Sequence, residues 1–167
     1  MKQKMEEIKK LVNQGFKGFM PIRELRLSTN IIPKVKGVYV VLRNKDIAPQ
    51  FLEKGTGGFH KGKNPNVSIE ELKNNWIADS KIVYIGKGGD PSIDATLNSR
   101  IKQYLNFGKG GKSHYGGRFI WQLSDAEDLI IAWKELPDDI PSEVETKMIK
   151  EFKQSHNGKR PFANLNK

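Results

Sequence analysis

Two short apolar segments, each with a tyrosine close to a glycine, most constrain how this chain can fold. Residues 35–42 form a β-branched run that contains Gly37-Val38-Tyr39, and residues 81–86 end in Tyr84-Ile85-Gly86. A third run of this kind covers residues 129–136. Apolar runs of this length are typical of strands that are covered by other elements. The sequence therefore predicts a small sheet.

Apolar residues at helical spacing surround these strands. The expected helices are residues 2–16, a short one from Ser68, one around 97–105 and one from Ser142 to about Gln154. Gly15 and Gly18 would end the first helix, before Pro21. The pattern predicts an α/β (α+β) fold in which helices flank one small sheet.

The chain is strongly basic. It has 29 Lys and Arg against 19 Asp and Glu, a net charge of +10 and a pI of about 9.7. No acidic residue lies between Ala95 and Ser124, a stretch that contains Arg100, Lys102, Lys109, Lys112 and Arg118. This balance favours a polyanionic partner. Charge alone does not choose between DNA, RNA and an anionic membrane, and a solvated surface run is the alternative.

Composition also limits the class of protein. A chain of 167 residues is most simply one domain, 1–167. No apolar run approaches the ~20 residues that span a bilayer. The N-terminus lacks the apolar stretch of a secretory signal, and there are no cysteines. We expect a soluble, cytoplasmic protein without membrane contact.

Common nucleotide and zinc motifs fail on spacing. Gly111-Lys112-Ser113 lacks the glycine that a P-loop needs five residues earlier, and Gly86-Lys87-Gly88 has Pro91 where a dinucleotide fingerprint needs its third glycine. The three histidines also lack the spacing of zinc ligands.

Glu145 is the first candidate for a chemical role. It precedes Met148, Ile149 and Phe152 by three, four and seven residues, so it lies on or beside the buried side of its helix. A buried carboxylate is costly unless it is paired or binds a metal. The alternative is local, because Glu145 also fits a capping box with Ser142.

Four other side chains are candidates, each with a simpler alternative. Tyr39 and Tyr84 are good strand residues and would pack in the core without any function. A phenol of pKa ~10 needs nearby cations or a metal to act as a base. Arg100 is either a surface arginine or a bidentate ligand of a phosphate, and it shares a helix face with Tyr104.

Taken in order, these residues resemble the GIY-YIG nuclease family from about Val35 to the C-terminus. The matching elements are Gly37-Val38-Tyr39, Tyr84-Ile85-Gly86-Lys87, Arg100 with Tyr104, Glu145 before an apolar pair, and Pro161 with Asn164. The resemblance implies a mainly antiparallel, three-stranded sheet. It also implies a metal-dependent endonuclease that hydrolyses DNA phosphodiester bonds.

The resemblance assigns roles to individual residues. Glu145 would bind one Mg²⁺ or Mn²⁺, and Tyr39 would take the proton of the attacking water with help from Tyr84. Arg100 and Lys87 would neutralise the phosphate. In the same scheme Tyr104 would line the site and Asn164 would hold its geometry.

The chain departs from the family pattern in two places. Residues 1–34 form an N-terminal extension, and residues 44–80 form an insert between the two tyrosine segments. His114 has no counterpart in the family motif, so it is either a nucleic-acid or active-site contact or an ordinary loop histidine. The candidate nucleic-acid contacts are Lys87, Arg100, Lys102, Lys109, Lys112, His114 and Arg118.

A second function stays open at this stage. The same basic surface suits a non-catalytic or partner-dependent nucleic-acid-binding module on the same fold. The sequence also leaves open whether RNA is bound, and whether the chain works alone, as a homodimer or with a partner protein.

Overall fold

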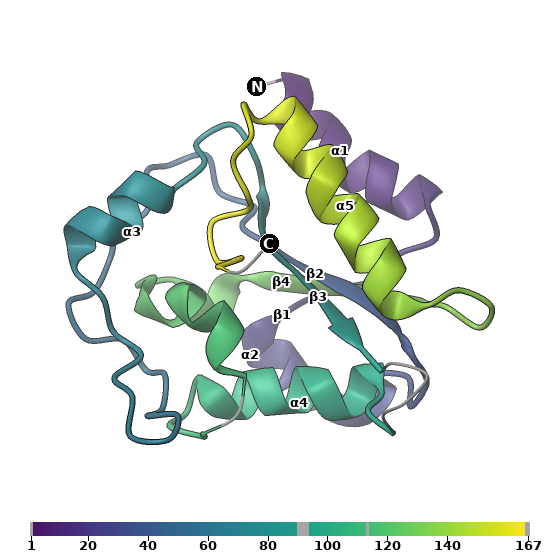
Figure 1. The fold of residues 1–167 in the computed structure, drawn as a ribbon, viewed down its shortest axis with the longest axis horizontal. Coiled ribbons are helices and arrows are strands. Elements are labelled where there is room, and N and C mark those ends of the chain that lie inside the picture. The colour runs from purple at the N-terminus through teal and green to yellow at the C-terminus, as the bar shows by residue number, and fades with distance from the viewer. Residues whose placement is uncertain (1, 90–93, 113, 166–167) are drawn as a thin grey trace.

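The sheet has four strands and is antiparallel throughout. The computed structural model describes residues 2–89, 94–112 and 114–165. Its strands are β1 (Lys17–Pro21), β2 (Gly37–Leu42), β3 (Ile82–Gly88) and β4 (Ile130–Glu135), in the order β1-β4-β2-β3 (Figure 1). The three predicted strands are present, but the prediction of a three-stranded sheet was wrong.

The missed strand is β1. Gly15 and Gly18 are not simply the end of the first helix, as expected, because residues 17–21 form a strand that pairs with β4. A register shift between Gly18 and Met20 interrupts the ladder, and Gly18 has a φ of +93°. A Cβ at Gly18 would lie 2.7 Å from the ring of Trp133. The bulge breaks the alternation of side chains by which a strand is recognised.

Helices cover both faces of the sheet (Figure 1). On one face lie α1 (Lys2–Asn13) and α5 (Pro141–Ser155), and on the other lie α2 (Ile22–Leu25), α4 (Leu97–Phe107) and the 3₁₀ helix η2 (Tyr115–Gln122). The first helix ends three residues earlier than predicted, at Asn13. The insert contains α3 (Ile69–Asn75), and two 3₁₀ turns, η1 (Thr29–Ile31) and η3 (Ala126–Asp128), complete the fold.

Strand β2 divides the core into two parts. Val38, Val40 and Leu42 pack in the cluster beneath α1 and α5, whereas Tyr39 and Val41 belong to the cluster on the side of α2 and α4. All six residues of β2 are buried. This alternation places the hydroxyl of Tyr39 inside an apolar core, where it needs a polar partner.

The C-terminal segment covers the outer edge of β3. Ala163 N donates to Val83 O at 2.8 Å. The Asn164 side chain then binds both backbone groups of Ile85: Oδ1 accepts from Ile85 N, and Nδ2 donates to Ile85 O, each at 2.9 Å. An edge strand is thereby closed by side-chain and backbone hydrogen bonds.

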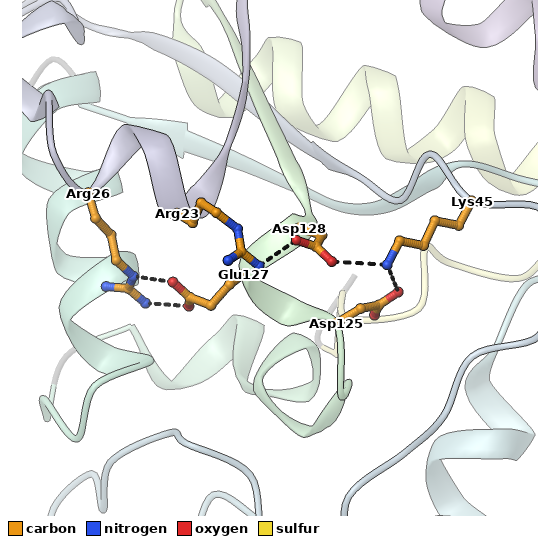
Figure 2. A network of polar contacts seen from close by, with 6 residues as sticks. All are labelled: Arg23, Arg26, Lys45, Asp125, Glu127 and Asp128. Carbon is orange, nitrogen blue, oxygen red and sulfur yellow. Dashed lines mark hydrogen bonds and ion pairs between the residues drawn. The ribbon is translucent and has the colours of Figure 1, made fainter.

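A network of charges joins α2, η3 and the start of the insert (Figure 2). Arg26 makes two hydrogen bonds to Glu127, at 2.7 and 2.9 Å. Arg23 binds Asp128, and Lys45 lies 3.0 Å from Asp128 and 3.5 Å from Asp125. Exposed pairs contribute little one by one, but a two-pronged arginine contact inside a network fixes geometry.

Within the described parts of the chain, no helix is long and apolar enough to cross a membrane.

We expect Asn164→Ala to lower the free energy of unfolding by about 1–3 kcal/mol, because both backbone groups of Ile85 lose their partner. Urea unfolding of N164A beside N106A, which removes an exposed amide from α4, measures the difference. Equal stability of the two variants would show that the C-terminal segment does not hold β3.

Candidate functional site

Three tyrosines from three elements and one histidine form a single aromatic cluster on the α4 side of the sheet. The ring centroids of Tyr39 and Tyr84 are 6.0 Å apart, and that of Tyr104 lies 6.3 and 5.2 Å from them. The His114 ring stacks on Tyr104 at 3.8 Å, with an angle of 9° between the ring planes. We call these four residues the tyrosine centre.

The pairing of β2 with β3 places the two strand tyrosines. Tyr39 lies opposite Gly86, and Val41 lies opposite Tyr84. A Cβ at residue 86 would lie 2.5 Å from Cζ of Tyr39, so only glycine leaves room for the ring. Val41 shares a face with Tyr39, and its cross-strand partner Tyr84 therefore lies on that face too.

Two hydrogen bonds satisfy the most deeply buried hydroxyl groups. Tyr39 Oη lies 2.5 Å from His114 Nε2, and Tyr104 Oη donates to the carbonyl of Gly117 at 2.6 Å. His114 directly precedes η2 with a φ of +72° and a ψ of +40°. A left-handed backbone is unusual for histidine, and here it accompanies a ring that is packed into the core.

Burial sets the protonation states of the centre. It raises the pKa of Tyr39 and of Tyr84 above the ordinary value, with smaller contributions from neighbouring groups, and it raises the pKa of Tyr104 likewise. Burial of the ring is the main cause that lowers the pKa of His114, and the positive charge of Arg100 lowers it further. At neutral pH the tyrosines therefore keep their protons and His114 is neutral. His114 Nδ1 is buried without a hydrogen-bond partner among the described residues.

Two charges of opposite sign act on the centre from different helices. Arg100 of α4 lowers the pKa of Tyr39 and Tyr84, whereas Glu145 of α5 raises the pKa of both. Both charged groups thus lie within electrostatic range of the two strand tyrosines. Arg100 is half-buried and donates to Gln103 Oε1 at 2.8 Å.

The local alternative for Glu145 does not match the start of its helix. Helix α5 begins at Pro141 after Ile140 as N-cap, with no capping hydrogen bond from a side chain. Ser142 is therefore the second helical residue and not the N-cap. Glu145 is only 7% exposed. Among residues 2–89, 94–112 and 114–165, no three His, Asp or Glu side chains are grouped as metal ligands.

The other predicted site residues lie at several separate places in the structure. Lys87 lies opposite Val38, at a register position on the α5 side of the sheet, away from the face of Tyr39. Asn164 binds the backbone of β3 next to Tyr84. Lys102, Lys109 and Lys112 are exposed, and the Arg118 guanidinium packs 4.0 Å from the centroid of the Tyr115 ring.

The contact between Tyr39 and His114 was not predicted. From the sequence, His114 is either a contact for nucleic acid or the active site or an ordinary loop histidine. The two residues are far apart in the chain and share no spacing pattern. The glycines around His114 were the available signal, because Gly117 admits no Cβ beside the Tyr104 hydroxyl.

Comparisons of the chain with protein-family models, with curated proteins and with solved structures found no match.

The lowered pKa of His114 predicts a stability that depends on pH. The unfolded state binds a proton near pH 6.5 that the folded state binds only at lower pH, so stability is full above that pH and falls as the pH drops. From pH 7.5 to pH 5 we expect the wild type to lose about 1–2 kcal/mol more than His114→Gln.

Urea unfolding at the two pH values measures this loss. H60Q retains the buried imidazole and is expected to follow the wild type. An identical pH dependence of H114Q and the wild type would contradict a neutral, buried His114.

Proposed function

We propose that this protein is a metal-dependent endonuclease that hydrolyses DNA phosphodiester bonds. The observation that carries the proposal is the hydrogen bond between Tyr39 and a neutral His114, within electrostatic range of Arg100 and Glu145. Metal-dependent hydrolysis of a phosphodiester needs a proton acceptor, a cation that binds the phosphate and a carboxylate that binds the metal. The basic composition supports a nucleic-acid substrate.

His114 Nε2 offers Tyr39 an acceptor for its own proton. Because the raised pKa of Tyr39 keeps its hydroxyl protonated, Tyr39 alone is a poor base at neutral pH. In the proposed step, water attacks phosphorus and passes its proton to Tyr39 Oη, while Tyr39 passes its own proton to His114 Nε2. The bond from phosphorus to the leaving oxygen breaks, and solvent protonates that oxygen.

Arg100 is the proposed ligand of the scissile phosphate. Tyr39 and Tyr104 are fully buried, whereas Arg100 and Tyr84 are half-buried. We therefore place the phosphate and the water on the side of Arg100 and Tyr84. A guanidinium can hold two phosphate oxygens at once and neutralise the charge that develops during attack.

Glu145 is the proposed ligand of Mg²⁺ or Mn²⁺. Mg²⁺ is usually bound through one or two carboxylates, with waters and phosphate oxygens as the other ligands, so one buried carboxylate fits such an ion. The bound ion would stabilise negative charge on the phosphate and the leaving oxygen. The other contribution of Glu145 is its negative charge, which opposes ionisation of Tyr39 and Tyr84.

Tyr39→Phe should lower the rate of DNA cleavage by about 10²–10⁴-fold, the usual contribution of a general acid–base group. H114Q should lose activity as well, because Tyr39 then has no imidazole to accept its proton. Initial rates on supercoiled plasmid with Mg²⁺ or Mn²⁺ measure both. Thermal unfolding and DNA binding without metal control for damage to the fold. Wild-type rates in Y39F would exclude Tyr39 as the base.

Glu145→Gln should abolish cleavage and leave metal-free DNA binding intact, because the amide keeps the shape of the side chain but not its charge. Glu143→Gln on the same helix, at an exposed position, is the matched control and should cut normally. Nicking by E145Q at the wild-type rate would exclude Glu145 as the metal ligand. Testing matched RNA beside DNA decides the polymer.

The full burial of the Tyr39 side chain favours a second candidate function. On that view the protein is a nucleic-acid-binding module that does not cut, or cuts only with a partner that opens the centre. Salt-sensitive binding of plasmid without any cleavage, in Mg²⁺ and in Mn²⁺, would favour this candidate over the nuclease.

A further inference from the structure

The insert contains a tight hairpin that carries an exposed phenylalanine. His60 and Lys63 form an antiparallel bridge, and Lys63 N donates to His60 O at 2.8 Å. Lys61 and Gly62 both have positive φ, of 51° and 77°, as the central residues of a type I′ turn do. Phe59, next to the turn, is 53% exposed. We call residues 59–63 the insert tip.

The insert tip is held against the segment that carries His114. The His60 ring stacks on Tyr115 with centroids 5.5 Å apart, and His60 Nδ1 lies 2.5 Å from the carbonyl oxygen of Lys112. Tyr115 directly follows His114 and in turn contacts the Arg118 guanidinium. The stack from His60 to Arg118 therefore fixes the tip relative to the tyrosine centre.

Close backbone contacts reinforce this attachment. Gly58 N donates to Phe107 O at 3.0 Å, and a Cβ at Gly58 would lie against the carbonyl oxygen of Gly111. The Tyr115 hydroxyl also donates to Asn64 O at 3.2 Å. A group that is already ordered loses less entropy when it binds a ligand.

The surroundings of the tip are positively charged. Lys61 and Lys63 are exposed on the tip, and Lys109 and Lys112 are exposed on the neighbouring loop. No acidic residue lies between Gly55 and Ile69. An exposed aromatic ring among lysines is the combination that single-stranded nucleic acid requires, because bases stack on the ring while phosphates contact the cations.

We infer that the insert tip binds an unpaired nucleotide of the DNA substrate. Phe59 stacks on the base, and Lys61 and Lys63 bind the flanking phosphates. This inference rests on the proposed function, which it makes more specific: the substrate is DNA with an unpaired segment beside the cut. The faces of paired bases are covered by their neighbours in the stack, so intact duplex offers Phe59 no partner.

The test is binding without metal, so that it does not depend on cleavage. Fluorescence anisotropy in chelator compares the wild type and F59A on three labelled DNAs of one sequence: a single strand, a blunt duplex and a duplex with a single-stranded flap. We expect F59A to bind the single strand and the flap about fivefold more weakly or worse, with duplex binding unchanged. Val12→Ala, on α1 and also 53% exposed, is the matched control and should bind as the wild type does.

Salt dependence tests the lysines separately. For the single strand, a plot of log K against log salt concentration should become less steep when both Lys61 and Lys63 are removed. We expect the slope to change by about 1.4, because each lost phosphate contact contributes about 0.7. The double variant of Lys9 and Lys10, exposed on α1, should keep the wild-type slope. Equal loss of duplex and single-strand affinity in F59A, or no loss in either, would overturn the inference.

The outcomes also separate this inference from the proposed nuclease. Selective loss of single-strand binding in F59A supports the tip even if plasmid is never cut. If cutting requires metal and Glu145 but F59A binds as the wild type does, the nuclease proposal stands and the inferred role of the insert tip is wrong.

Discussion

The close approach of Tyr39 to Gly86 is the constraint on which the centre of this structure depends. The two residues are cross-strand partners, and any side chain at position 86 would occupy the space of the phenol ring. With Tyr39 in that space, its hydroxyl lies in the core rather than in solvent. The other three members of the tyrosine centre all have their rings close to this ring.

A hydroxyl that is buried in a core needs a polar partner, and the segment after α4 supplies the partners of two buried tyrosines. His114 supplies the partner for Tyr39, and the Gly117 carbonyl supplies the partner for Tyr104. Both come from the glycine-rich stretch after α4, which the insert packs against through His60 and Tyr115. The same contacts that satisfy the core therefore bring the insert tip next to the proposed catalytic residues.

Individual elements show where sequence reasoning succeeded and where it failed. The strands β2, β3 and β4 were predicted because their apolar runs are continuous. A short helix was correctly expected from Ser68, which caps α3 because its Oγ accepts from Glu71 N. Strand β1 was missed because a bulge at Gly18 hides its alternation. The capping box at Ser142 was wrong, because the helix begins at Pro141 and leaves Ser142 inside it. Asn164 was predicted to hold the geometry of the site. No pattern in the sequence showed that its side chain binds the backbone of β3.

The sequence by itself determined three of the four strands, most of the helices, the basic charge and the identity of the tyrosine, arginine and glutamate candidates. These follow from periodicity and composition, which act over a few residues. Only the tertiary structure decided that His114 meets Tyr39, that Lys87 lies on the opposite face, and that the insert tip stands beside the centre. Such contacts join residues far apart in the chain. They are selected by packing and by the need to pair buried polar groups, and neither leaves a regular spacing in the sequence.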